Sequence, residues 1–195
     1  MKSPQSSIIK SIRARTKDRV LFVDAFENFG SSTAVRQAFS RLHKAGIIVR
    51  IANGIYYYPN KLNDKPILIP EIAEEIAKRD KAKILPTASY AQYVLGLSTQ
   101  LPTNYVFITN GTPRTIHIGD NTIKFKRATA KNFAFKSKLL YLIVVSLKAM
   151  FDKPNNIQEN IIRKHLINIP EDQFKHDIDL APYRIKMLLK KLRYN

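Results

Sequence analysis

The chain has 195 residues, of which 45% are apolar, so it can bury one sizeable core or two smaller ones, and this argues against global disorder. Its 33 Lys and Arg against 15 Asp and Glu give a formal charge of +18, which attracts polyanions, chiefly nucleic acid and secondarily an anionic membrane or an acidic protein. Cysteine is absent, which excludes disulfides, thiolate metal sites and thiol nucleophiles.

The first element predicted is a helix that begins near Pro4, because Ile8, Ile9 and Ile12 share one face at helical spacing. The apolar run at residues 19–23 then predicts a short strand.

Two further helices follow this strand. Asp24 is the expected N-cap of a short helix that Gly30 closes. The next helix is predicted to extend to Lys44, with Gly46 as its stop. Its candidate N-caps are Ser31, Ser32 and Thr33.

The segment at residues 47–59 predicts a β-hairpin. Asn53 and Gly54 separate two apolar runs, and we expect a positive φ at both positions. The order of three helices and a hairpin is that of a winged helix-turn-helix domain, which we assign to residues 1–60.

The polar stretch at residues 60–66 is the best domain boundary. Beyond it we expect a second α+β domain at residues 67–195, with a small antiparallel sheet and C-terminal helices. Its first helix opens at Pro70 and carries an apolar stripe of Ile72, Ala73 and Ile76. A strand at residues 82–85 and a helix that ends at Gly96 follow.

Three strands are expected next, at residues 104–109, 114–118 and 122–128. The turn signals Asn110-Gly111 and Gly119-Asp120-Asn121 separate them, so they predict a three-stranded antiparallel meander.

The rest of the chain reads as helices at residues 138–151, 157–167 and 182–193. In the last helix, one stripe consists of Ile185, Leu188, Leu189 and Leu192, and the other positions carry Arg184, Lys186, Lys190, Lys191 and Arg193. This helix could dock on the core, contact nucleic acid or bind a partner. From Lys61 onward, 23 Lys and Arg face 12 Asp and Glu, so a second nucleic-acid surface is plausible there.

The helix predicted from Ser32 to Lys44 has two distinct faces. One is apolar, and the other carries Thr33, Arg36, Gln37, Ser40, Arg41 and Lys44 without a carboxylate. Solvated faces usually mix charges of both signs, so this composition favours phosphates and base edges. The alternatives are a helix that only closes a small core and, for the net charge, a Lys-rich proteome of low GC content.

A double-stranded DNA interface follows from this face. We expect Arg36, Gln37 and Arg41 to lie nearest the bases. The complete set of candidate DNA-binding residues is Lys10, Arg13, Ser31, Ser32, Thr33, Arg36, Gln37, Ser40, Arg41, Lys44, Arg50 and Asn53.

Other motifs do not indicate chemistry. The four histidines lack metal-ligand spacing, and Glu71, Glu74 and Glu75 occupy the first turns of a predicted helix, where carboxylates favour the dipole. The segment GLSTQ lacks the second glycine of a nucleophile elbow, and no Gly-rich phosphate loop is present. We therefore expect no enzyme, no metal and no cofactor, with a nuclease of dispersed carboxylates left open.

The sequence also lacks targeting signals. Its N-terminus has no continuous apolar core of signal-peptide type, and the run at residues 139–147 is far shorter than the roughly 20 residues that span a bilayer. We expect a soluble cytoplasmic protein without membrane contact.

Two segments carry a family resemblance, FGSSTAVRQAFSRLHKAGIIVRIANGIYYYP and PTASYAQYVLGLSTQLPTNYVFITNGTPRTIHIGDNTIKFKR. Over residues 8–148 the chain resembles the DUF6088 family, which is related to the AbiEi-type antitoxins of bacterial type IV toxin–antitoxin systems. The resemblance implies a winged helix that represses its own operon and a C-terminal domain that counteracts a nucleotidyltransferase-type toxin without necessarily binding it.

The resulting hypothesis is a type IV antitoxin that binds its own promoter as a transcriptional autorepressor. The alternative is an RNA-binding or protein-interaction module in which the winged helix is only a scaffold.

Overall fold

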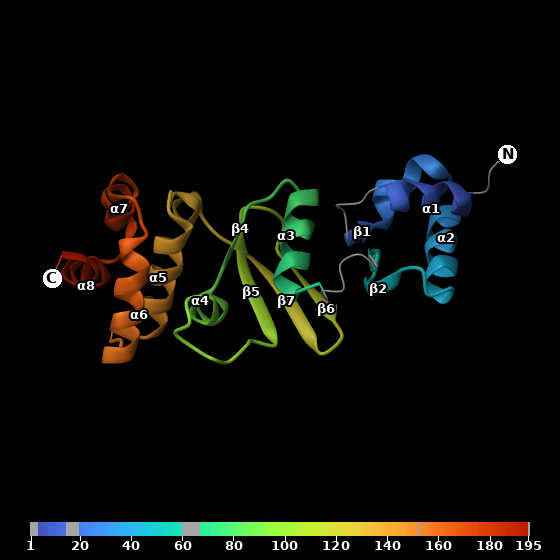
Figure 1. The fold of residues 1–195 in the computed structure, drawn as a ribbon. Coiled ribbons are helices and arrows are strands. Elements are labelled where there is room, and N and C mark those ends of the chain that lie inside the picture. Colours follow the sequence, from blue (N-terminus) through green and yellow to red (C-terminus); the bar gives the residue numbers. More distant parts are fainter. Residues whose placement is uncertain (1–3, 15–19, 60–66, 152, 195) are drawn as a thin grey trace. The chain divides into compact units, whose positions relative to one another are not determined.

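The computed structural model describes residues 4–14, 20–59, 67–151 and 153–194 (Figure 1). It is a mixed α+β structure with two small sheets. The chain divides into two compact units, one drawn from residues 1–75 and 116–120 and the other from residues 76–115 and 121–195. The predicted domain boundary at residues 60–66 lies outside the described residues.

The first unit combines helical segments with a small three-stranded sheet. Its elements are α1 (Pro4–Ala14), β1 (Val20–Phe22), the 3-10 helix η1 (Val23–Phe29), α2 (Ser32–Lys44), β2 (Val49–Ala52) and β3 (Ile55–Tyr57). The strands form a sheet in the order β1-β3-β2, and β3 is antiparallel to both neighbours. The helices and strands predicted here are therefore confirmed.

Aromatic rings join these elements into one core. The ring of Phe39 on α2 lies 5.2 Å from that of Phe26 on η1 and 5.1 Å from that of Tyr56 on β3, measured between centroids. The other core side chains are Ile8, Ile12, Leu21, Val35, Ala38, Leu42 and Ile48. Since full burial of a large apolar side chain stabilises by about 1.5–3 kcal/mol, this core fixes the buried face of α2.

Two details of this unit differ from expectation. Asp24 is not an N-cap, because η1 already begins at Val23, whose N–H donates to the carbonyl of Gly54 at 3.0 Å in place of a side-chain cap. In the hairpin only Gly54 has a positive φ, of 71°, and Asn53 does not. The register shifts between Arg50 and Ala52, and such a bulge supplies twist that a two-residue turn would otherwise provide.

The division between the units passes through α3 (Ile69–Arg79) and β6 (Arg114–Ile118). Helix α3 begins at Ile69, one residue before the predicted opening at Pro70, and Glu71 lies in its first turn as predicted. The Oε2 atom of Glu71 also accepts from the N–H of Leu68 at 3.0 Å. The predicted stripe of Ile72, Ala73 and Ile76 is buried.

The second sheet has the order β4-β5-β7-β6. Its strand β4 (Ile84–Pro86) is antiparallel to β5 (Asn104–Thr109), whereas β5 is parallel to β7 (Asn121–Arg127). The predicted antiparallel meander is therefore wrong: β5 and β6 are not neighbours, and the sheet is mixed.

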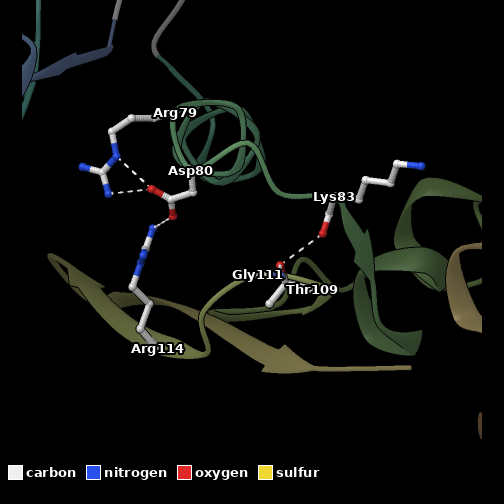
Figure 2. A network of polar contacts seen from close by, with 6 residues as sticks. All are labelled: Arg79, Asp80, Lys83, Thr109, Gly111 and Arg114. Atoms are coloured by element: carbon white, nitrogen blue, oxygen red, sulfur yellow. Dashed lines mark hydrogen bonds and ion pairs between the residues drawn. The ribbon is translucent and has the colours of Figure 1, made fainter. Parts of the chain in front are cut away.

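Hydrogen bonds at the end of β5 explain this difference. Asn110 Oδ1 accepts from the N–H of Lys83 at 2.7 Å. Thr109 Oγ1 donates to the carbonyl of Lys83 at 3.1 Å, as Figure 2 shows. The same hydroxyl accepts from the N–H of Gly111 at 3.0 Å. Thr109 and Asn110 thus attach the end of β5 to the segment before β4, and Asn110-Gly111 does not close a turn between paired strands.

Gly111 is required here for space. A Cβ at this position would lie 2.7 Å from Cβ of Ala82, so the Gly111→Ala variant is expected to lower the free energy of unfolding by about 1–3 kcal/mol. Urea denaturation would measure the loss. Because the clash is with one methyl group, adding Ala82→Gly should recover part of it, and a double variant less stable than the sum of the single changes would contradict this explanation.

The remaining elements are mainly helices. They are α4 (Ala88–Val94), the 3-10 helix η2 (Ala130–Phe133), α5 (Lys138–Ala149), α6 (Asn156–Ile167), α7 (Glu171–Asp177), the 3-10 helix η3 (Ile178–Leu180) and α8 (Tyr183–Tyr194). Figure 1 shows α5 and α6 side by side, and they contact each other. The helix predicted to reach Phe151 ends earlier, since Phe151 has a φ of 53°. No helix of the described segments is long and apolar enough to cross a membrane.

The core of the second unit is centred on α5. Leu140, Ile143 and Leu147 are fully enclosed, and the hydroxyl of Tyr141 donates to the carbonyl of Pro86 at 3.1 Å. Burial raises the pKa of Tyr141 to about 12, so this hydroxyl remains a donor at all physiological pH values.

A buried carboxylate holds the segment that leads into α5. Asp177 at the end of α7 is inaccessible to solvent and accepts from the N–H groups of Lys136 at 2.9 Å and Ser137 at 2.6 Å. His176 Nδ1 lies 2.6 Å from the same carboxylate. Ser137 in turn caps α5, since its hydroxyl accepts from the N–H of Leu140 at 3.2 Å.

The last helix docks on the other helices. Its predicted apolar stripe is confirmed, with Ile185, Leu189 and Leu192 buried. Arg193 donates to the carbonyls of Leu166 at 2.8 Å and Ile169 at 2.9 Å, so it caps the end of α6.

Candidate nucleic-acid interface

Both ends of α2 are fixed by local hydrogen bonds. Ser31 is the N-cap, and its Oγ accepts from the N–H of Ala34 at 3.3 Å. At the other end the N–H of Ile47 donates to the carbonyl of Leu42 at 3.0 Å, and Gly46 has a φ of 70°. This pattern is the Schellman motif, and it ends the helix where the sequence predicted.

The two faces of α2 differ as predicted. Val35, Ala38, Phe39 and Leu42 are buried. The opposite face is exposed and carries Thr33, Arg36, Gln37, Ser40, Arg41 and Lys44. Residues three or four apart on a helix have Cβ atoms about 5–6 Å apart, so these side chains form one continuous polar strip.

The first turn of α2 adds backbone donors to this strip. The N–H of Val35 makes the first bond to the carbonyl of Ser31, at 2.9 Å, and the N–H groups of Ser32 and Thr33 precede it. Such groups at a helix N-terminus attract phosphate. Ser31, Ser32 and Thr33 are all exposed.

The β2–β3 hairpin contributes two further candidates. Arg50 on β2 and Asn53 in the turn are exposed, and β2 is the outer strand of its sheet. The position of the hairpin beside α2 is fixed by His43, whose Nδ1 lies 3.2 Å from the carbonyl of Ile48, and whose ring contacts that of Tyr56.

The last two candidates, Lys10 and Arg13, lie on α1 and are exposed. Ile8 and Ile12 bury the other face of α1, and this helix packs against α2. Every predicted DNA-binding residue is thus accessible to a ligand, and all of them belong to the first unit.

The charged side chains of this surface are almost all positive. Within residues 20–59, the acidic side chains are Asp24 and Glu27, and both lie on η1. From α2 to the end of β3 there is no carboxylate, whereas Arg36, Arg41 and Lys44 are exposed. This surface can neutralise phosphates and present arginine and glutamine donors to base edges.

A cluster in the second unit was missed from the sequence (Figure 2). The carboxylate of Asp80 accepts from the guanidinium groups of Arg79, at 2.9 Å, and of Arg114. Arg114 also lies over the ring of Phe125, 5.6 Å from its centroid. These residues tie the end of α3 to β6, and no sequence signal relates Asp80 to an arginine so far along the chain.

No curated protein matches the chain. A family model described as a family of unknown function, DUF6088, matches residues 7–177, which is most of the sequence, and the chain therefore belongs to this family.

Proposed function

We propose that the chain is a sequence-specific DNA-binding protein and that α2 is its recognition helix. The observation that carries this proposal is the exposed strip of α2, with three cations, a glutamine and two hydroxyls and no carboxylate. Helix faces that contact only solvent usually carry charges of both signs, whereas this strip carries the donors that bind phosphates and base edges in a major groove.

The roles of the residues follow from their chemistry. Arg36 and Arg41 can donate two hydrogen bonds to guanine, and Gln37 can pair with adenine through its amide. Hydroxyl and cationic side chains, together with the amide of Asn53, instead position the protein on the DNA backbone. That second group consists of Lys10, Arg13, Ser31, Ser32, Thr33, Ser40, Lys44, Arg50 and Asn53.

The order of elements in the first unit supports a winged helix-turn-helix at residues 1–60. Helices α1 and η1 pack against α2, and a hairpin of β2 and β3 follows α2 directly. In this interpretation the hairpin is the wing, and it brings Arg50 and Asn53 to the duplex beside α2.

A more specific proposal rests on the resemblance to AbiEi-type antitoxins. The DNA bound is then the promoter of the chain's own operon, which the protein represses. Residues 67–195 form the part that counteracts a nucleotidyltransferase-type toxin, with or without a stable complex. A nucleotidyltransferase-like reading frame next to the gene would support this extension.

The second candidate is an RNA-binding or protein-interaction module in which the winged helix is a scaffold. One observation favours it: Lys124, Lys126 and Arg127 of β7 are exposed, so the second unit also has a basic surface. Exposed cations on a sheet suit an irregular polyanion as well as a duplex.

Competition at constant salt distinguishes the two candidates. Labelled duplex DNA from the chain's own promoter would be bound to the full chain and challenged with unlabelled duplex or with a structured RNA of equal length. If the proposal is correct, the promoter duplex competes best, and an unrelated duplex competes less well. Equal or better competition by the RNA would contradict DNA recognition and support the second candidate.

A further inference from the structure

A cavity of about 290 Å³ opens on the second unit, and none of the candidate DNA-binding residues lines it. Its walls come from η2 and the residues that follow it, the last turn of α5, η3 and the two residues between η3 and α8. The side chains that matter here are Lys131, Asn132, Phe135, Lys148, Asp179 and Pro182. Small-molecule sites have volumes of roughly 300–1,000 Å³, so this cavity suits a small ligand.

The charge of the cavity is positive. Neither Lys131 nor Lys148 has a side-chain hydrogen bond or ion pair among the residues that the structure describes. The acidic group, Asp179, is already neutralised, since its carboxylate lies 2.5 Å from Nζ of Lys186. This hydrogen bond lowers the pKa of Asp179, which keeps the ion pair intact at neutral pH. Two positive charges therefore remain available to a ligand.

Two helix ends lie at the cavity, and their dipoles act on a bound anion in opposite directions. Pro182 immediately precedes the first turn of α8, where unpaired N–H groups favour an anion. Lys148 stands in the last turn of α5, where it offsets the negative end of that helix. A dianion is thus attracted by Lys131, Lys148 and the start of α8.

An aromatic ring and an amide supply the other recognition groups. The ring of Phe135 packs edge-on against Tyr141, with centroids 5.5 Å apart, so its orientation is fixed. The amide nitrogen of Asn132 donates to Oγ1 of Thr129 at 3.1 Å, which leaves its oxygen as an acceptor. A planar ring that carries N–H donors could contact both.

We propose that this cavity binds a small organic phosphate with a planar ring, of the nucleoside monophosphate class. A phosphate monoester carries about −1.5 to −2 charges at pH 7, which matches the two unpaired lysines. The ring would lie against Phe135. This site does not depend on DNA binding by α2.

Isothermal titration of the full chain with AMP, GMP, CMP and UMP tests the proposal. At least one should bind saturably, and ribose 5-phosphate, which has the phosphate without the ring, should bind more weakly. Lys131→Ala and Lys148→Ala should each weaken binding by about tenfold, as expected for a lost charged hydrogen bond. Lys164→Ala, which removes an exposed lysine of α6 outside the cavity, should leave it unchanged.

Two outcomes overturn the proposal: no saturable binding by any of the four nucleotides, or binding that Lys131→Ala and Lys148→Ala leave as it is. If ribose 5-phosphate bound as tightly as the nucleotides, the proposed recognition of a planar ring would also be rejected. The 5′-phosphorylated and unphosphorylated forms of a dinucleotide then identify the source. Displacement of the nucleotide by the phosphorylated form indicates a nucleic-acid end, and its failure to compete indicates a free nucleotide.

Discussion

Replacing Arg36 and Gln37 together by alanine is expected to weaken binding to the promoter duplex at least about thirtyfold, because each bidentate base contact is worth on the order of 1–3 kcal/mol. Both side chains are exposed and neither belongs to the core beneath α2, so the variant should fold normally. Sequence preference should relax as well, because the lost contacts are to bases. Gel shifts with the promoter and a scrambled duplex would measure both effects.

Three control variants separate base contacts from charge. Arg36→Lys keeps the charge but loses the two-pronged donor, so it should relax specificity too. Lys44→Ala removes a proposed phosphate contact, so it should weaken binding to both duplexes alike and reduce the salt dependence of binding by about one phosphate contact. Arg184→Ala removes an exposed arginine of α8 and should have no effect. Promoter binding that survives the double replacement unchanged would reject α2 as the recognition helix.

Asp177→Ala is expected to lower the free energy of unfolding by about 3 kcal/mol or more. The substitution leaves the buried N–H of Ser137 and the partly buried N–H of Lys136 without their acceptor, and a buried unpaired donor costs about 1–3 kcal/mol. The loss should also loosen the start of α5, which runs through the core of the second unit. Guanidinium denaturation monitored by circular dichroism would give the value.

Asp179→Ala is the matched control, since the same residue type is removed two positions along the chain. Its carboxylate is largely exposed and pairs with Lys186 at the surface, so the expected loss is below about 1 kcal/mol. If both variants lost the same small amount, the hydrogen bonds of Asp177 would contribute no more than a surface ion pair.

The helices with a clear apolar period could be predicted from the sequence. Ser31 and Gly46 mark the ends of α2, and the buried residues of α8 follow the expected stripe. Helix α7 escaped prediction because its seven residues include a single buried apolar side chain, Phe174. One apolar residue cannot define a period.

The pairing of strands could not be predicted, because it depends on contacts between distant segments. Asn110-Gly111 has the composition of a hairpin turn, but the side chain and the backbone N–H of Asn110 are both bonded to Lys83. Local composition reports which conformations a turn allows and does not report which partner a strand finds.

The candidate sites also differ in whether the sequence alone could predict them. The exposed strip of α2 lies on one helix, so its spacing alone was sufficient to predict it. The cavity between η2 and α8 joins Lys131, Lys148 and Pro182, and the Asp80 cluster joins Arg79 and Arg114. No sequence period connects such residues, and only the tertiary packing brings them together.

The parallel pairing of β5 with β7 has a consequence for folding kinetics. The ladder runs from Asn104 opposite Thr122 to Thr109 opposite Arg127, so the sequence separation is the same for every pair, and no pair is local. A hairpin could form from its turn outward, one short loop at a time, whereas this ladder must first close the whole loop that contains β6. Pairing of β5 with β7 therefore has a larger entropic barrier than the formation of a meander from the same strands would have. The edges of these strands also stay unpaired for longer while the chain folds.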